Sequence, residues 1–299
     1  MKKRKNAIGD SRGDKVYYII CGTIVTLLTL IVLYPLIYVL SASFSSAKAV
    51  TSGRMWLWPV DLTVVGYKYI LQYRSVWIGY RNTIFYSLGS TAIGVALSMI
   101  CAYPLARKGL RGRRFFSLIF TFTMIFSGGM IPSYILMKNL KILNTVWVML
   151  IPGCMSVYNM IIARTFIQNT IPDELIDASR IDGCSDFMFF FKILLPLSIT
   201  IIAVLSMTYI ASNWNAYFNA FLYLSDKEKY PLQIFLREIL INSSFEADML
   251  DPDAVEQLQT LQLLLKYSII VVSTLPMLCV FPFFQKYFQK GVMIGSVKG

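Results

Sequence analysis

The sequence predicts an all-α, polytopic membrane protein with six transmembrane helices and with both termini in the cytosol (N-in/C-in). Three observations support this class. Hydrophobic residues make up 56% of the chain and charged residues only 15%, and the mean hydropathy is +0.60. Such values are typical of membrane proteins and exceed those of soluble domains. The third observation is that six segments of 19 to 33 residues contain no charged side chain.

Each uncharged segment is long enough for one bilayer crossing, which needs about 20 apolar residues. The predicted helices comprise residues 16–41, 83–106, 115–137, 144–166, 193–214 and 261–284. The first segment is too long for the apolar region of a cleaved signal peptide. We therefore expect a basic cytosolic tail at residues 1–15, a transmembrane domain at 16–285 and a cytosolic C-terminal tail at 286–299.

The positive-inside rule predicts the orientation of these helices. With the N-terminus inside, the cytosolic segments contain 17 of the 28 Lys and Arg residues and 7 of the 16 acidic residues. Their net charge is +10, against +2 for the external segments. The pI is about 9.4. We attribute the excess of basic residues to membrane topology and to contact with anionic lipid, and not to nucleic-acid binding.

The cysteine and histidine content excludes several kinds of site. The five cysteines form no pair at metal-ligand spacing, and the chain has no histidine. These counts indicate no metal site and no disulfide framework, and they remove the commonest general base. No Asp or Glu lies within the six uncharged segments, so the ion relay of a secondary carrier is not visible. We expect no catalysis and no cofactor bound by this chain, and an energy source outside it.

The third predicted helix contains a sequence that should bend or unwind it. Gly128, Gly129 and Pro132 lie within five residues of one another. A helix break in a bilayer is tolerated only where the freed backbone groups face protein or a water-filled cavity. Two roles stay open for this break, the lining of a solute path and a packing kink.

The most informative segment is the predicted cytosolic loop over residues 168–192. Thr170 followed by Asp173 resembles a capping box, and Pro172 suits the first turn of a helix. The carboxylates of Asp173 and Glu174 complement a helix N-terminus. A short helix should therefore begin in a loop whose length exceeds that of a simple connection.

The second half of this loop predicts a sharp turn and another helix. Gly183 after Asp182 should end the first helix, because glycine accepts the left-handed C-cap conformation, and Ser185 offers a new N-cap. Two capped helices exposed to the cytosol are typical of a docking element, and the small Ala178 and Ser179 would let a partner approach the backbone closely. A passive surface helix is the alternative.

The same loop resembles the EAA loop of binding-protein-dependent ABC importer permeases. That family pattern is Glu-Ala-Ala, three residues, Gly, and a trailing Ile-x-Leu-Pro. The matching residues here are Asp177, Ala178, Ser179, Gly183, Phe190, Ile193 and Pro196. Asp replaces Glu at 177 and Ser replaces Ala at 179, and both changes retain charge or small volume.

The resemblance covers nearly the whole chain and is closest to the maltose-type carbohydrate permease subfamily, in its branch for complex or oligomeric saccharides. The stretches that carry it are residues 82–83, 102–107, 126–134, 213–215 and the tail 290–299. It implies the type I ABC importer permease fold, in a bacterial cell membrane. In that family the EAA loop is the coupling helix that sits in a cleft of a cytosolic ATPase dimer.

The coupling residues implied by the resemblance are Glu174, Asp177, Ala178, Ser179, Asp182 and Gly183. This sequence has no Gly-x-x-x-x-Gly-Lys-Ser/Thr phosphate-binding loop, so ATP and Mg²⁺ belong to the partner ATPase. The resemblance also implies a second permease subunit, in a heterodimer, and an external solute-binding protein. That protein is expected to press on the first external loop and on the acidic external loop over residues 226–257.

A path for sugars needs aromatic rings and uncharged hydrogen-bonding groups, because sugars offer hydroxyls and apolar ring faces. The residues expected to line it are Tyr134, Tyr158, Asn159, Ser212, Asn213, Trp214 and Asn215. The alternatives are interfacial anchoring for Trp214 and interhelical hydrogen bonding for the asparagines.

Three functions are considered for this sequence. The first is an ATP-driven sugar importer that works by alternating access, with an oligosaccharide as substrate. The second is an ABC permease for an amino acid, peptide or phosphate, which has no reason to carry the Ser-Gly-Gly-Met-Ile-Pro stretch at 127–132. The third is a self-contained channel or carrier, which predicts intramembrane ionisable residues or an inverted repeat, and the sequence shows neither.

Overall fold

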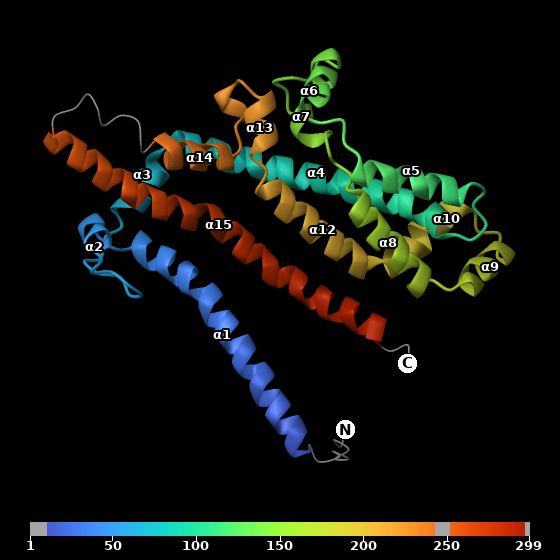
Figure 1. Ribbon diagram of the computed structural model, residues 1–299. Helices are drawn as coiled ribbons and strands as arrows, with labels where there is room; N and C mark the ends of the chain where they lie inside the picture. The colour runs from blue at the N-terminus through green and yellow to red at the C-terminus, as the bar shows by residue number, and fades with distance from the viewer. Residues whose placement is uncertain (1–10, 243–251, 297–299) are drawn as a thin grey trace. The chain divides into compact units, whose positions relative to one another are not determined.

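The computed structural model describes residues 11–242 and 252–296, which form helices and connecting loops without a strand (Figure 1). The elements are α1 (Arg12–Ser43), α2 (Ala47–Thr51), α3 (Val65–Gln72), α4 (Arg74–Ala106), α5 (Arg113–Ile125), α6 (Met130–Asn139), α7 (Trp147–Leu150), α8 (Val157–Thr170), α9 (Asp173–Ile181), α10 (Asp186–Phe189), the π-helix η1 (Phe190–Leu194), α11 (Leu195–Leu197), α12 (Ile199–Trp214), α13 (Phe218–Tyr223), the 3-10 helix η2 (Lys227–Lys229), α14 (Leu232–Asn242) and α15 (Pro252–Ser296). The all-α prediction is confirmed.

The chain divides into two compact units. Unit 1 comprises the described parts of Met1–Gln72 and Asn242–Val271, and unit 2 those of Tyr73–Ile241 and Val272–Gly299. In unit 1, α1 begins with a capping box in which the Asp14 N–H donates to Ser11 Oγ at 3.2 Å. Of its 32 residues only Ser41, Ala42 and Ser43 are buried. Such an apolar helix presents its side chains to lipid or to another subunit.

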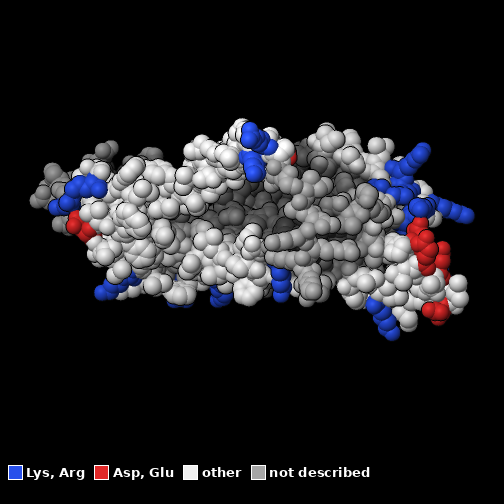
Figure 2. Space-filling model, turned by 90° about the horizontal axis from the view of Figure 1, so that it is seen from below, with Lys and Arg blue, Asp and Glu red and all other residues white. Residues whose placement is uncertain are grey.

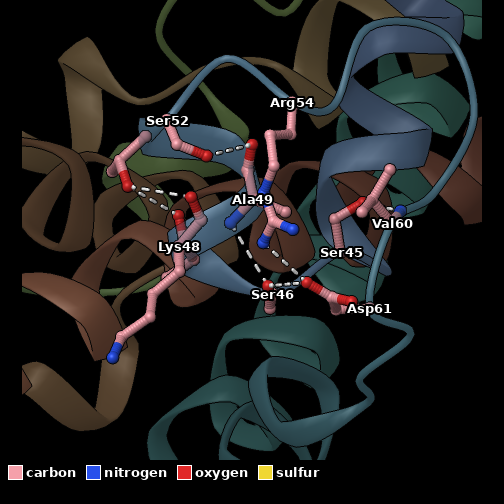
Figure 3. Close-up of polar contacts among 10 residues, drawn as sticks. Ser45, Ser46, Lys48, Ala49, Ser52, Arg54, Val60 and Asp61 are labelled. Carbon is pink, nitrogen blue, oxygen red and sulfur yellow. Dashed lines mark hydrogen bonds and ion pairs between the residues drawn. The ribbon is translucent and has the colours of Figure 1, made fainter.

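A polar turn follows α1 in unit 1 (Figure 3). Ser46 caps α2 by accepting the Ala49 N–H at 3.2 Å, and Arg54 forms an ion pair with Asp61 at 2.9 Å. These contacts fix the turn next to a small hydrophobic core. The buried residues of this core are Ala42, Ala49, Val50 and Met55, and Leu263 and Tyr267 of α15 pack against them.

In unit 2, α4 packs against α8 and α12. A Cβ atom on Gly94 would lie 2.3 Å from the Cys154 carbonyl oxygen and 3.0 Å from the Tyr209 ring. The Tyr209 hydroxyl lies 2.8 Å from Ser98 Oγ and accepts the Ser156 N–H at 2.9 Å. Small and hydroxylated residues therefore join these helices, as is common for helix association in membranes.

Three helices are long and apolar enough to cross a membrane, namely Arg12–Ser43, Arg74–Ala106 and Thr260–Tyr287 within α15. Two bent pairs also pass this test when each is taken together. These are α5 with α6, bent by 110°, and Asp186–Leu197 with α12, bent by 78°. The described residues thus contain three to five candidate spans, where the sequence predicts six.

The fourth predicted helix, residues 144–166, is not continuous. α7 ends at Leu150 and α8 begins at Val157, with Pro152 and Gly153 in the break. Proline lacks a backbone donor, and Gly153 has a φ of +69°. The prediction of one continuous helix was wrong. It was based on the absence of charged residues from this segment, and Pro152 and Gly153, which break the helix, are uncharged.

The second predicted helix, residues 83–106, begins earlier than expected, at Arg74. Asn82 and Thr83 therefore lie inside α4 and are available to hold another segment. The Asn82 amide donates to the Glu228 carbonyl at 2.8 Å, and the Leu232 N–H donates to Thr83 Oγ1 at 2.8 Å. These bonds attach the start of the predicted external loop to α4.

Parts of the predicted loops and tails lie outside the described residues, namely residues 1–10, 243–251 and 297–299. In the external loop over 226–257, the structure forms the 3-10 helix η2 and the helix α14. The predicted C-terminal tail continues α15 as far as Ser296.

Candidate functional site

α9 forms the first half of the predicted coupling loop. It starts at Asp173, and Pro172 is its N-cap. Thr170 belongs to the last turn of α8, where its buried Oγ1 has no hydrogen-bond partner in the described part of the chain. The capping-box prediction was wrong because the hydrogen bonding of α8 continues to Ile171, whose N–H donates to the Ile167 carbonyl at 3.0 Å.

The C-terminus of α9 is a sharp left-handed turn. Gly183 has a φ of +76°, a conformation that residues with a Cβ atom adopt only at a cost. Its N–H donates to the Arg180 carbonyl at 3.0 Å, and the Cys184 N–H donates to the Ser179 carbonyl at 2.9 Å. This pair of bonds is the Schellman motif, with Asp182 as the C-cap, and it agrees with the turn that the sequence predicts.

The second half of the loop is attached to the end of α4. Ser185 caps α10 by accepting the Met188 N–H at 3.2 Å. Asp186, the first residue of α10, forms an ion pair with Arg107 and lies 3.9 Å from Arg180. The two short helices are therefore joined to each other and to α4 through charged groups.

A second ion pair attaches α9 to the basic loop that follows α4. Lys108 Nζ lies 2.7 Å from Asp173 Oδ2. This hydrogen bond and the charge of Asp173 raise the pKa of Lys108. The Lys108 ammonium therefore stays charged at neutral pH and loses its charge only as the pH rises through that raised value.

One face of α9 is open to a partner. Glu174, Asp177, Ala178 and Ile181 are all exposed and share a face, since they follow the i, i+3, i+4, i+7 spacing. Ile181 is 87% exposed, in a helix that otherwise presents polar and small groups there. Ile181 is not among the residues predicted from the sequence, although the same spacing places it on this face.

Ser179 lies on the opposite face. It is buried, and its Oγ donates to the Ile176 carbonyl at 2.7 Å. Leu175 and Ile176 pack against the core that α4, α8 and α12 share. The small size of Ser179 therefore lets α9 approach its own chain, whereas Ala178 is exposed on the other face.

Figure 2 shows basic and acidic side chains gathered at the right-hand end of unit 2, where α9 lies in Figure 1. The acidic residues of the loop are Asp173, Glu174, Asp177, Asp182 and Asp186, and the basic residues of the α4–α5 loop include Arg107, Lys108 and Arg111. No group of three or more His, Cys, Asp or Glu side chains in the described residues could hold a metal ion.

The seven residues expected to line a sugar path lie on three elements. Tyr134 lies in α6, Tyr158 and Asn159 lie in the first turn of α8, residues 212–214 end α12, and Asn215 is the C-cap of α12. Tyr158 and Ser212 are exposed, and Asn159 is buried. The Tyr134 ring stacks on that of Tyr223 with a centroid distance of 6.1 Å.

Trp214 has a structural position. It is 5% exposed, its Nε1–H donates to the Ser273 carbonyl at 3.0 Å, and its ring lies 6.4 Å from that of Tyr80. It therefore joins α12 to α15 inside unit 2.

Replacing Trp214 with phenylalanine should destabilise the protein and leave sugar selectivity unchanged. The change removes one buried hydrogen bond, which costs about 0.5–1.5 kcal/mol. Thermal unfolding of the purified complex measures the loss. A shift in the order of preferred sugars would contradict this structural role.

The predicted break in the third helix lies between α5 and α6. Gly129 is the N-cap of α6, with a φ of +85°, and Pro132 lies in the first turn of that helix. A proline is tolerated there because its missing N–H would have no intrahelical acceptor. Gly128 and Gly129 therefore separate the two helices, and Pro132 belongs to the start of the second.

Comparison with known proteins identifies the family of this chain. The family model described as binding-protein-dependent transport system inner membrane component matches residues 94–294. The polygalacturonan/rhamnogalacturonan transport system permease protein YtcP of Bacillus subtilis is 40% identical over 273 residues, which are 90% of this chain and 94% of that protein. The arabinooligosaccharides transport system permease protein AraQ of Halalkalibacterium halodurans is 27% identical, over 90% of this chain and 92% of its own.

A solved structure has the same fold. It is a crystal structure of a bacterial ABC transporter involved in the import of the acidic polysaccharide alginate, and one of its chains matches with a TM-score of 0.83 and 33% identity. The match covers 94% of this chain and 100% of that one. This chain therefore belongs to the binding-protein-dependent transport system inner membrane components, the permease subunits of ABC importers, in which a separate ATPase hydrolyses ATP.

Proposed function

We propose that this chain is the membrane-spanning subunit of a bacterial importer that accepts an oligosaccharide from an external binding protein. The observation that carries the proposal is the exposed face of α9, which ends in the Gly183 turn. An ion pair joins Asp173 of α9 to Lys108 in the loop after α4, and a second joins Asp186 of α10 to Arg107 at the end of α4. A helix held in this way can transmit force from a partner to the membrane helices. The relatives that import polygalacturonan/rhamnogalacturonan and arabinooligosaccharides support a sugar substrate.

In this proposal the coupling residues act in two groups. Glu174, Asp177, Ala178 and Asp182 contact a cleft of the ATPase, and Gly183 and the buried Ser179 maintain the shape of the element. When two ATPase subunits close on ATP, they draw the coupling helices together. Rigid-body rotation of the attached helices then changes the exposure of the path from one side of the membrane to the other.

The topology follows from the same proposal. Three continuous helices, two bent pairs and the broken α7–α8 segment would make six crossings, with both termini in the cytosol and with the domain limits that the sequence predicts. One such subunit encloses half of a path, so a related second permease completes it. Tyr134, Tyr158, Asn159, Ser212, Asn213 and Asn215 would face the sugar, while Trp214 supports them.

The proposal is tested by ATP hydrolysis of the complex in nanodiscs, together with its binding protein. The binding protein is loaded with an acidic oligosaccharide, a neutral oligosaccharide or a peptide. We expect one of the sugars to stimulate hydrolysis and the peptide to have no effect. Stimulation by the peptide alone would contradict a sugar substrate, and failure of any ATPase to co-purify would contradict the importer assignment.

Replacing Ile181 with aspartate should weaken the attachment of the ATPase. Ile181 is 87% exposed, so the change should not affect folding, but it removes the apolar group from the docking face. If the docked ATPase buries the Ile181 side chain, the loss of this contact costs about 1.5–3 kcal/mol of binding free energy, which is at least tenfold in affinity. Binding of the isolated ATPase to the permease in nanodiscs measures this effect. Ile181→Leu is the matched control and should bind normally, and equal affinities of both variants would exclude Ile181 from the contact.

A further inference from the structure

A second polar site lies in unit 2, between α5 and α8. It is an open hollow of about 490 Å³, lined by Arg113, Arg114, Ser117, Leu118, Thr121 and Arg164. The first five residues come from the first three turns of α5, and Arg164 comes from the middle of α8. The hollow therefore brings together arginines that are 50 residues apart in the sequence.

The charge of this hollow is not balanced. Three of its six lining residues are arginines, and none is acidic. Within the described residues no ion pair joins Arg113, Arg114 or Arg164 to a carboxylate, whereas Arg107 and Lys108 of the same loop each have an acidic partner. Three like charges at one opening attract an anion.

Arg164 is the most constrained of the three arginines. Its guanidinium donates to Ser117 Oγ at 3.3 Å, but its Nε is buried and has no hydrogen-bond partner among the described residues. A buried charged donor without a partner is costly, and the cost is relieved when an acceptor binds. Guanidinium groups bind phosphate oxygens strongly, because their geometry allows two parallel hydrogen bonds.

The surface beside the hollow is apolar. Phe115, Leu118, Phe122 and Ile125 share one face of α5 and are between 58% and 83% exposed. Together with α6, α5 forms one of the candidate membrane spans. A ligand that fits both parts has an anionic head beside the arginines and a hydrocarbon tail along α5.

We propose that this three-arginine hollow binds the phosphodiester head of an anionic phospholipid, whose acyl chains lie along the exposed face of α5. The Ser117 hydroxyl, which accepts from the Arg164 guanidinium, keeps its own proton for a phosphate or glycerol oxygen, whereas the Thr121 hydroxyl donates to the Ser117 carbonyl at 2.8 Å. A free phosphate would use the arginines but leave the apolar face of α5 uncovered. The inference depends on the membrane location of the chain and not on the identity of its substrate.

The test uses the purified complex in nanodiscs that contain phosphatidylglycerol and phosphatidylcholine in equal amounts. Native mass spectrometry after release from the nanodisc counts the lipids that stay bound. We expect phosphatidylglycerol to be retained in preference, and Arg164→Gln and Arg114→Gln each to lower its retention about fivefold, as expected for one basic residue at an anionic surface. Arg114 is exposed, so its replacement should not affect folding.

Arg111→Gln is the matched control. Arg111 is exposed in the same basic loop but does not line the hollow, so its replacement should leave retention unchanged. Equal retention of both lipids, or equal losses in all three variants, would overturn the proposal. Displacement of phosphatidylglycerol by inorganic phosphate would identify a free anion as the ligand. If a carboxylate of another subunit occupied the arginines, the complex would retain both lipids equally.

Discussion

Replacing Gly183 with proline should abolish the stimulation of ATP hydrolysis by the loaded binding protein while the complex stays assembled. Proline fixes φ near −65°, and the turn needs +76°. Proline also removes the N–H that donates to the Arg180 carbonyl. The exposed face of α9 and the start of α10 would then no longer have their present orientation. We expect a loss of about 5- to 150-fold, which corresponds to coupling free energies of about 1–3 kcal/mol.

The control for this prediction is Gly183→Asn. Asparagine tolerates the left-handed conformation, and an added Cβ at position 183 would meet no atom within 4 Å. Stimulated hydrolysis should therefore be close to normal in this variant. The measurement is the ratio of hydrolysis with and without loaded binding protein, and size-exclusion chromatography reports assembly. Normal stimulation of the proline variant would mean that the turn does not transmit the signal.

Replacing Gly94 with valine should strongly destabilise unit 2. Even the first added carbon would lie 2.3 Å from the Cys154 carbonyl oxygen, and a backbone atom cannot move aside as a flexible side chain can. α4 would have to separate from α8 and α12, which would strain the hydrogen bonds of Tyr209. Overpacking of this kind costs about 3 kcal/mol or more.

Thermal unfolding of the complex in detergent measures this destabilisation. The matched control is Gly22→Val, because Gly22 also lies in the interior of a long apolar helix, α1, and has no atom within 4 Å of an added Cβ. Its midpoint should change little or rise slightly, since valine has a higher helix propensity than glycine. Equal destabilisation by both changes would show that the close approach of Cys154 and Tyr209 to Gly94 is not what limits stability.

The ends of α9 and α10 could be predicted from the sequence because helix caps depend on local residues. Gly183 and Ser185 have the positions that the local sequence predicts. Thr170 is the exception. Its side chain could equally cap a following helix or end the preceding one, and only the continued hydrogen bonding of α8 decides between them.

The orientation of side chains around α9 could not be predicted in the same way. Ser179 and Ala178 are both small, and the sequence alone treats them as equivalent. Packing against α4 and α8 buries Ser179 and leaves Ala178 and Ile181 exposed. Trp214 is a similar case, because its hydrogen bond joins it to Ser273, a residue 59 positions away in the chain.

The sequence by itself determined the membrane class, the helical composition and the turn between α9 and α10, because hydropathy, charge spacing and capping are properties of short segments. Only the tertiary structure decided where long apolar segments break, which face of α9 is open, and that Arg164 lies with Arg113 and Arg114. These features depend on contacts between distant residues. Many side chains satisfy the same apolar pattern, and only the packing of the helices selects which of them meet.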